Sequence, residues 1–435
     1  MKQILLSILM ILSFLQVHAQ EDIVIQEDSI DTELTDSLFA DSIDTDRQLT
    51  VQERINHLLE ARLFSTSQVG IMVLDLTADT LVYAHNERQT LRPASTMKLT
   101  TAITALDRLG GAYRYSTKLK FKGAIYDASM PGDDVKKNVL VGNLIAVGGM
   151  DPRFNSDDMN AFIEALQTEH IDTIYGEVTA DRSFKDSDML GEGWCWDDKN
   201  PVLTPLLWNR KDEFVFKFTQ SLRNAGIVIR SKSDIPRDSL GNRLYTSQRE
   251  NTATLITRYH TIDQILVKMM KESDNLYAES MFYQIAASVA KGKRPGRAKD
   301  AAEAVKGVIR AAGLNPSDYR IADGSGLSLY NYQSAELQTR LLRYAYRNSN
   351  IYEHLYPSLP IAGVDGTLKK RMTNSKAKGN VHAKTGTLTG VSSLAGYVTA
   401  SNGNILCFSI INQGSLQTSP AKSFQDKVCN ILCGY

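Results

Sequence analysis

Cysteine is scarce in this sequence, with only four residues among 435. The cysteines follow no regular spacing, so they predict neither a disulfide framework nor a metal-binding motif. Buried free thiols, or a single incidental disulfide, are the simplest interpretations. The four residues are Cys195, Cys407, Cys429 and Cys433.

A net charge of either sign is also lacking, because 49 basic residues balance 49 acidic ones. This balance gives no indication of a nucleic-acid partner. The sequence contains no glycine-rich nucleotide loop and no zinc-ligand spacing, so we expect no cofactor.

Long apolar runs are missing except at the N-terminus, "MKQILLSILMILSFLQVHAQ". Its basic start, its apolar run from Ile4 to about Val17 and the "VHA" that follows are typical of a secretory signal peptide cleaved near Ala19. The run is shorter than the roughly 20 residues of a comfortable membrane span, and an uncleaved anchor is the alternative. We therefore expect an exported, periplasmic protein without stable membrane insertion.

The rest of the chain divides by composition. Residues 20–50 are acidic and rich in Asp, Ser and Thr, which predicts a flexible tether. Residues 51–112 begin with an amphipathic helix, continue with a hairpin made of "VGIMVLDL" and "LVYAHN", and end in a helix over residues 94–109.

Residues 113–250 have a different pattern, in which short strand-like segments alternate with loops. We expect a smaller, mostly-β inserted domain there. Helical patterns return in residues 251–435, which end in a hairpin around "SNG" and a final helix from about Ala421. Strands thus open and close the folded part. The predicted fold is α/β (α+β), with one antiparallel sheet built from 51–112 and 251–435 and covered by helices.

One serine precedes a lysine by a helical turn at the start of a long apolar helix, as Ser95 and Lys98 in "RPASTMKLTTAITAL". A serine hydroxyl is a weak nucleophile that needs a base within hydrogen-bonding reach, and residues i and i+3 share a helix face. The Ser-x-x-Lys pattern occurs three more times, but only here does a helix dipole favour developing negative charge.

Two further motifs occur once each. "KESDNLYAES" contains Ser273 and Asn275, and "HAKTGTLTG" contains Lys384, Thr385 and Gly386. The order Ser-x-x-Lys, Ser-x-Asn, Lys-Thr-Gly is the signature of penicillin-binding proteins and serine β-lactamases. Singly, each motif has an ordinary explanation as a helix cap, a solvated helix start or an edge-strand charge. Those explanations leave the order unexplained.

Beyond these motifs, "YGEVTADRSF", "GWCWDD", "DGSGLSLYN" and "IAGVDGTLKKR" resemble the D-alanyl-D-alanine carboxypeptidase/endopeptidase family, the group of penicillin-binding protein 4. The resemblance covers most of the chain from about residue 50. It implies a transpeptidase-like domain split by an insertion between the first two motifs. It also implies hydrolysis of D,D-peptide bonds in peptidoglycan stem peptides through an acyl-enzyme, with β-lactams as covalent inhibitors.

The resemblance implies a role for each residue of the first two motifs. Ser95 attacks the carbonyl carbon of the penultimate D-alanine. Lys98 takes the serine proton, and burial together with the nearby charge of Lys384 keeps this amine neutral. Ser273 relays a proton to the leaving group, and Asn275 orients Lys98 and binds the substrate amide.

The third motif is expected to bind the substrate. Lys384 and Thr385 bind its terminal carboxylate, and Gly386 leaves the strand bare for the substrate backbone. The backbone N–H groups of Ser95 and Thr387 form the oxyanion hole.

Three further positions complete the predicted site region. "GGMDP" places Asp151 where relatives carry an acidic residue that meets the free amine of the stem-peptide side chain. Leu329 stands where the family often has an arginine, so the substrate contact of that arginine is missing from the pattern. Asp323 is predicted to shape the turn in "ADGSG".

Two alternatives remain open. A serine β-lactamase or related esterase would share the acylation step but release the acyl group rapidly. A non-catalytic peptidoglycan-binding scaffold would use the fold without the chemistry. The sequence does not decide between carboxypeptidase and endopeptidase action.

Overall fold

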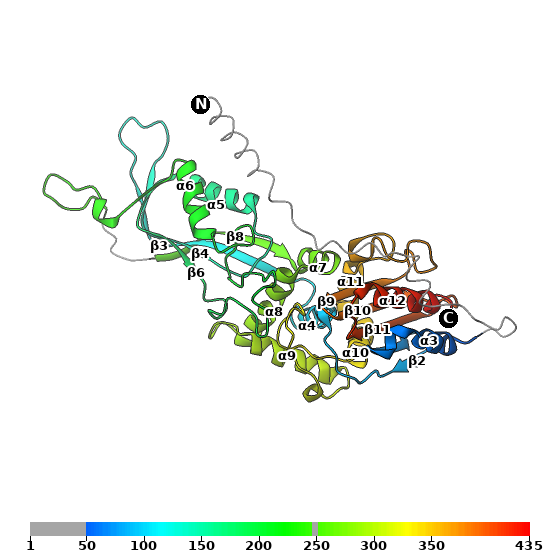
Figure 1. The fold of residues 1–435 in the computed structure, drawn as a ribbon. Helices are drawn as coiled ribbons and strands as arrows, with labels where there is room; N and C mark the ends of the chain where they lie inside the picture. The colour runs from blue at the N-terminus through cyan, green and yellow to red at the C-terminus, as the bar shows by residue number, and fades with distance from the viewer. Residues whose placement is uncertain (1–48, 246–250) are drawn as a thin grey trace, which may run out of the picture. The chain divides into compact units, whose positions relative to one another are not determined.

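The computed structural model describes residues 49–245 and 251–435 (Figure 1). The predicted signal peptide (1–19) and nearly all of the predicted tether (20–50) lie outside the described residues. Two sheets organise the chain: one with the strand order β2-β1-β11-β10-β9, and one with the order β7-β5-β4-β3-β8 and with β6 beside β4.

Both ends of the folded chain contribute to the first sheet, in which all neighbouring strands are antiparallel. Ile71 pairs with Ile410, so an early strand lies beside a late one. The two predicted hairpins are confirmed as β1–β2 and β10–β11. The strands are β1 (Gln68–Asp75), β2 (Thr80–His85), β9 (His382–Leu388), β10 (Val391–Thr399) and β11 (Ile405–Gln413).

Helices cover both faces of this sheet. On β11, Ser409 donates a hydrogen bond to Gln338 of α10 (Ala335–Tyr346), and Asn412 accepts one from Gln425 of α12 (Thr418–Leu432). Residues of opposite parity on a strand point to opposite faces, so α10 and α12 lie on different sides of the sheet. Burial of nearly every residue of β10 agrees with this sandwich. The predicted helix-covered antiparallel sheet is therefore confirmed.

Two helices form the centre of the larger core. Leu99 and Ile103 of α4 pack in one cluster with Met281 and Phe282 of α8. Most of α8 is buried, as expected of a helix enclosed by others. The remaining helices are α3 (Val51–Leu59), α4 (Met97–Leu109), α5 (Ser156–Thr168), α6 (Phe214–Asn224), α7 (Ile262–Lys271), α8 (Asn275–Ala290), α9 (Ala298–Ala311) and α11 (Ser349–Ser358).

The second sheet has its own apolar cluster, in which Phe162 of α5 and Phe218 of α6 pack beside Leu144 of β4. β8 begins just after residue 250, where we expected the inserted domain to end, but it pairs along β3 of the second sheet. We therefore propose that the inserted domain extends to Thr261. The strands are β3 (Arg114–Asp127), β4 (Asn138–Val147), β5 (Ile171–Tyr175), β6 (Val178–Asp181), β7 (Val228–Arg230) and β8 (Asn251–Thr261).

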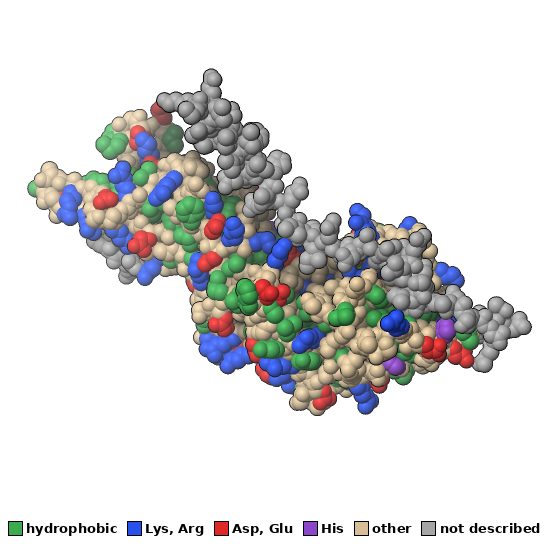
Figure 2. All heavy atoms as spheres, in the orientation of Figure 1, with side chains coloured by type: hydrophobic (Ala, Val, Ile, Leu, Met, Phe, Trp, Pro, Cys, Tyr) green, Lys and Arg blue, Asp and Glu red, His purple; other side chains and the backbone are tan. Residues whose placement is uncertain are grey.

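The charges on the surface and the state of the cysteines agree with what the composition predicts. On the face in Figure 2, basic and acidic side chains are intermingled, as the balanced charge leads one to expect. All four cysteines lie in the described residues and are free thiols, three of them buried. Within those same residues, no helix is long and apolar enough to cross a bilayer.

Candidate active site

Ser95 lies on a short 3-10 turn, η3 (Ala94–Thr96), that leads into α4. Ala94 has a φ of 48°, a left-handed conformation that costs a non-glycine residue on the order of 1 kcal/mol. Thr96 occupies the N-cap position of α4 without a side-chain capping hydrogen bond, so Ser95 is not the residue at the cap. Strained backbone next to a reactive side chain is a common feature of functional sites.

Lys98 is completely buried directly behind the serine. Its Nζ lies 2.9 Å from Ser95 Oγ, 2.7 Å from Asn275 Oδ1 and 2.8 Å from the Ser325 carbonyl oxygen. A neutral amine has two N–H donors and one lone pair. Since Asn275 and Ser325 each supply an acceptor, the lone pair is left to face the serine hydroxyl.

Burial lowers the pKa of Lys98 to about 8, because desolvation penalises the ammonium form. The negative charges of Asp323, of Asp274 and, when it is ionised, of Glu279 oppose this shift. At pH 7, roughly a tenth of the molecules would then carry the neutral amine. Lys98 is thus poised to act as a base near neutral pH.

The second motif lies where α7 turns into α8. Ser273 has a φ of 60°, and Asp274 caps α8 by accepting a hydrogen bond from the Tyr277 N–H at 3.3 Å. Arg210 holds the Asp274 carboxylate with two contacts of 2.7 and 3.1 Å. Asn275 is therefore the first residue of α8, placed against Lys98 by a fixed helix end.

The third motif lies on β9, the edge strand of the first sheet. Lys384 is fully buried and donates to Ser273 Oγ at 2.8 Å and to the Thr385 carbonyl at 2.7 Å. The Thr385 hydroxyl bonds that of Thr367 at 2.7 Å, and Thr387 is exposed. Lys98 contacts both Ser95 and Asn275, and Lys384 contacts Ser273, so the three motifs meet in one site.

Gly386 allows β9 to pass close to the serine. A Cβ at this position would lie 2.2 Å from Ser393 Oγ and 2.9 Å from the Ser95 nitrogen. Both distances are shorter than the non-bonded contacts that a Cβ atom makes in proteins. We had expected the bare strand to admit the substrate backbone. The structure gives a further reason, which is the approach of β9 to the turn that holds Ser95.

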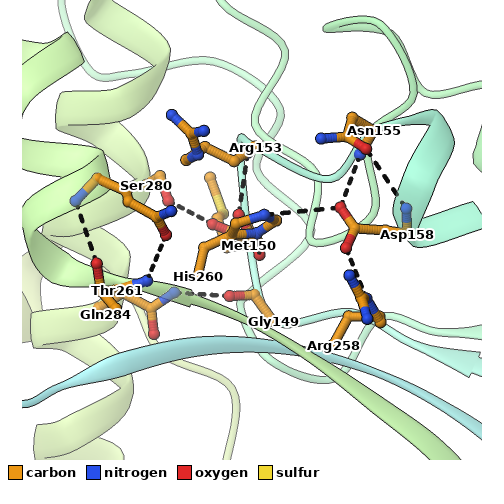
Figure 3. A network of polar contacts seen from close by, with 12 residues as sticks. Gly149, Met150, Arg153, Asn155, Asp158, Arg258, His260, Thr261, Ser280 and Gln284 are labelled. Atoms are coloured by element: carbon orange, nitrogen blue, oxygen red, sulfur yellow. Dashed lines mark hydrogen bonds and ion pairs between the residues drawn. The ribbon is translucent and has the colours of Figure 1, made fainter. Parts of the chain in front are cut away.

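Asp151 lies in a different polar network. Its partner there is His260, which is labelled in Figure 3. Its Oδ2 lies 2.7 Å from His260 Nδ1, its Oδ1 accepts the Arg153 N–H at 2.9 Å, and its side chain is fully buried. Both oxygens are therefore occupied within the protein. The role of Asp151 towards a substrate amine stays a prediction.

The same network attaches the second sheet to α8. Ser280 donates to the Met150 carbonyl, and Gln284 donates to the Gly149 carbonyl at 2.6 Å (Figure 3). The helix whose first residue contacts Lys98 is thus fixed further along by the segment after β4.

Sequence reasoning missed two groups of the site, the Ser325 carbonyl and Glu279 behind it. A main-chain carbonyl that acts as an acceptor cannot be recognised from the residue types of the sequence. The predicted role of Asp323 in shaping the turn is confirmed, because its carboxylate accepts the N–H groups of Gly326 and Ser328 at 2.8 and 2.7 Å. Across the part of the chain that is described, no cluster of His, Cys, Asp or Glu has the arrangement of a metal site.

A half-buried hydroxyl backed by a buried amine of lowered pKa is an arrangement for acyl transfer. The chain belongs to the D-Ala-D-Ala carboxypeptidase 3 (S13) family, which it matches over residues 51–207 and 206–433. This membership confirms the predicted class, a serine-type D-Ala-D-Ala carboxypeptidase, and favours it over the alternatives.

Individual proteins agree with the family. The chain is 24% identical to D-alanyl-D-alanine carboxypeptidase DacB of Haemophilus influenzae, over 87% of this chain and 93% of that one. It is 26% identical to an Actinomadura D-alanyl-D-alanine carboxypeptidase, over 89% and 85%. The crystal structure of penicillin binding protein 4 from H. influenzae has the same fold, with a TM-score of 0.71 and 24% identity, over 88% of this chain and 99% of that chain. A second structure of that protein holds a β-lactam.

Proposed function

We propose that the protein hydrolyses the D-Ala-D-Ala bond of peptidoglycan stem peptides through an acyl-enzyme on Ser95. The observation that carries this proposal is the 2.9 Å contact between Ser95 Oγ and the buried Nζ of Lys98. Lys98 takes the hydroxyl proton as Ser95 attacks the carbonyl carbon, D-alanine leaves, and water then hydrolyses the ester.

Lys384, the second buried amine of the site, acts on the terminal carboxylate and the leaving group of the substrate. Lys384 supplies positive charge, and with Thr385 it binds the terminal carboxylate of the substrate. Ser273, 2.8 Å from Lys384, passes a proton to the departing amine. As an edge strand, β9 offers main-chain groups to an extended peptide, and the N–H groups of Thr387 and Ser95 would hold the oxyanion.

β-Lactams would acylate the same serine, which the β-lactam complex of the H. influenzae relative supports. The lifetime of the adduct separates this proposal from a β-lactamase. We expect a penicilloyl-enzyme that persists for many substrate turnovers, whereas rapid release would favour the lactamase.

We also propose that the protein works in the periplasm after removal of residues 1–19. The basic, apolar and small-residue order of that segment supports export. Mass spectrometry of the protein recovered from the periplasm of an expressing cell should find Gln20 at the N-terminus. A mature protein that retains Met1 would contradict cleavage.

Purified muropeptides test the activity and the bond together. The parent protein should release free D-alanine from pentapeptides, and the Ser95→Ala variant should release none. Scission of cross-linked dimers in the same assay would add endopeptidase action. Equal D-alanine release by parent and variant would contradict the proposal.

A further inference from the structure

Glu279 is a buried carboxyl group to which the mechanism above gives no role. It lies on α8 one turn after Asn275, and it is 1% exposed. Its Oε1 accepts two backbone N–H groups, from Gly324 at 3.0 Å and from Ser325 at 2.8 Å. Residues i and i+4 lie on the same face of a helix, so Glu279 and Asn275 face the same region.

The loop that Glu279 holds carries one of the two acceptors of Lys98. The Ser325 carbonyl lies 2.8 Å from Lys98 Nζ, and Asn275 Oδ1 lies 2.7 Å from it. These acceptors fix the two N–H bonds of the neutral amine. Through Asn275 directly, and through Glu279 and the loop indirectly, α8 sets the direction of the lone pair.

Other contacts fix the neighbouring parts of this loop. Asp323 accepts from Gly326 and Ser328, and Thr101 donates to the Gly324 carbonyl at 2.7 Å. For the N–H groups of Gly324 and Ser325, the acceptor is Glu279. Removing that acceptor would leave two buried donors unpaired next to the reacting amine, which is costly and would move the loop.

We propose that Glu279 is a positioning residue for acylation, holding the Ser325 carbonyl so that the lone pair of Lys98 faces Ser95. This inference rests on the proposed function. Burial, with a smaller contribution from the charge of Asp323, raises the pKa of Glu279 to about 8. The side chain therefore accepts both N–H groups as an uncharged acid at neutral pH, and it adds no charge that would keep Lys98 protonated.

Two substitutions separate the acceptor from the charge. Glu279→Gln keeps an oxygen acceptor and removes the acid, whereas Glu279→Met keeps the volume and removes the acceptor. Gln425→Met is the matched control, because Gln425 is also a fully buried polar residue of a helix but bonds Ser392 and Asn412. The readouts are the rate constant of acylation by benzylpenicillin at saturation and the concentration that half-saturates it.

We expect Glu279→Met to lower the acylation rate constant about 100-fold with little change in half-saturation, as a misplaced catalytic group does. At pH 7, Glu279→Gln should stay within threefold of the parent, and so should the control. A Met variant that is folded and as fast as the parent would overturn the proposal. So would a Gln variant as slow as Met, since charge rather than geometry would then matter.

If Glu279→Met does not fold, the acylation rate constant of Glu279→Gln at pH 7 decides. A rate within threefold of the parent supports an uncharged positioning residue, and a rate about 100-fold lower overturns it. A parent protein that benzylpenicillin does not acylate at all would contradict the proposed function itself, which is a distinct result.

Discussion

At the residue scale, the reactivity of Ser95 depends on the environment of one lysine. Lys98 is buried, its three neighbours are oxygen atoms, and desolvation outweighs the carboxylates that favour its charged form. Burial alone therefore accounts for a lowered pKa. The positive charge of Lys384, which we had expected to assist, is not needed for this conclusion.

The pH dependence of acylation follows from this lysine. The base is the uncharged amine, and the pKa of Lys98 is about 8, so acylation by a β-lactam should rise with pH through about 8 and then level off. Stopped-flow measurement between pH 6 and pH 10 would show this rise. A rate that is constant across that range, or that still rises steeply at pH 10, would contradict Lys98 as the base.

At the element scale, local patterns in the sequence were sufficient for the hairpins and for the helix after Ser95. Apolar runs separated by short polar turns predicted the β1–β2 and β10–β11 hairpins. The 3-10 turn at Ala94–Thr96 and the loop around Ser325 could not be predicted in this way. Their conformations depend on contacts with distant residues such as Gly386 and Glu279.

The start of α8 is one element that can be tested by itself. Asp274 caps the helix and pairs with Arg210. Asp274→Asn keeps a good capping side chain and should cost little stability, whereas Asp274→Ala should cost about 1 kcal/mol in unfolding free energy. Chemical denaturation measures both.

The same pair of variants reports on the site. Because Asn275 follows the cap directly and contacts Lys98, Asp274→Ala should also slow acylation several-fold, more than Asp274→Asn does. Equal stability and equal rates in the two variants would contradict a capping role for Asp274.

The close approach of β9 to the serine turn gives another prediction. Gly386→Ala should reduce acylation by about 100-fold or more, because a Cβ would push β9 away from Ser95. Gly307→Ala in α9 is the control: nothing lies within 4 Å of its added Cβ, and alanine should stabilise the helix by about 0.5–1 kcal/mol. Full acylation in Gly386→Ala would show that the approach is unimportant.

At the scale of the whole molecule, the chain brings together motifs that lie far apart in sequence. One sheet takes strands from both ends of the folded chain, and α8 is held both by the segment after β4 and by Arg210. The order of the three motifs predicted that they would meet. The sequence could not show that Asp151 is enclosed in a second network, because its partner His260 lies on β8, far along the chain.

The central claim is that Ser95 is the nucleophile of a D,D-peptidase, and intact-mass measurement after incubation with benzylpenicillin tests it most directly. The account predicts one added penicilloyl group per chain, mapped to the peptide that contains Ser95 and absent from the Ser95→Ala variant. A parent protein of unchanged mass, or a label on another residue, would contradict it.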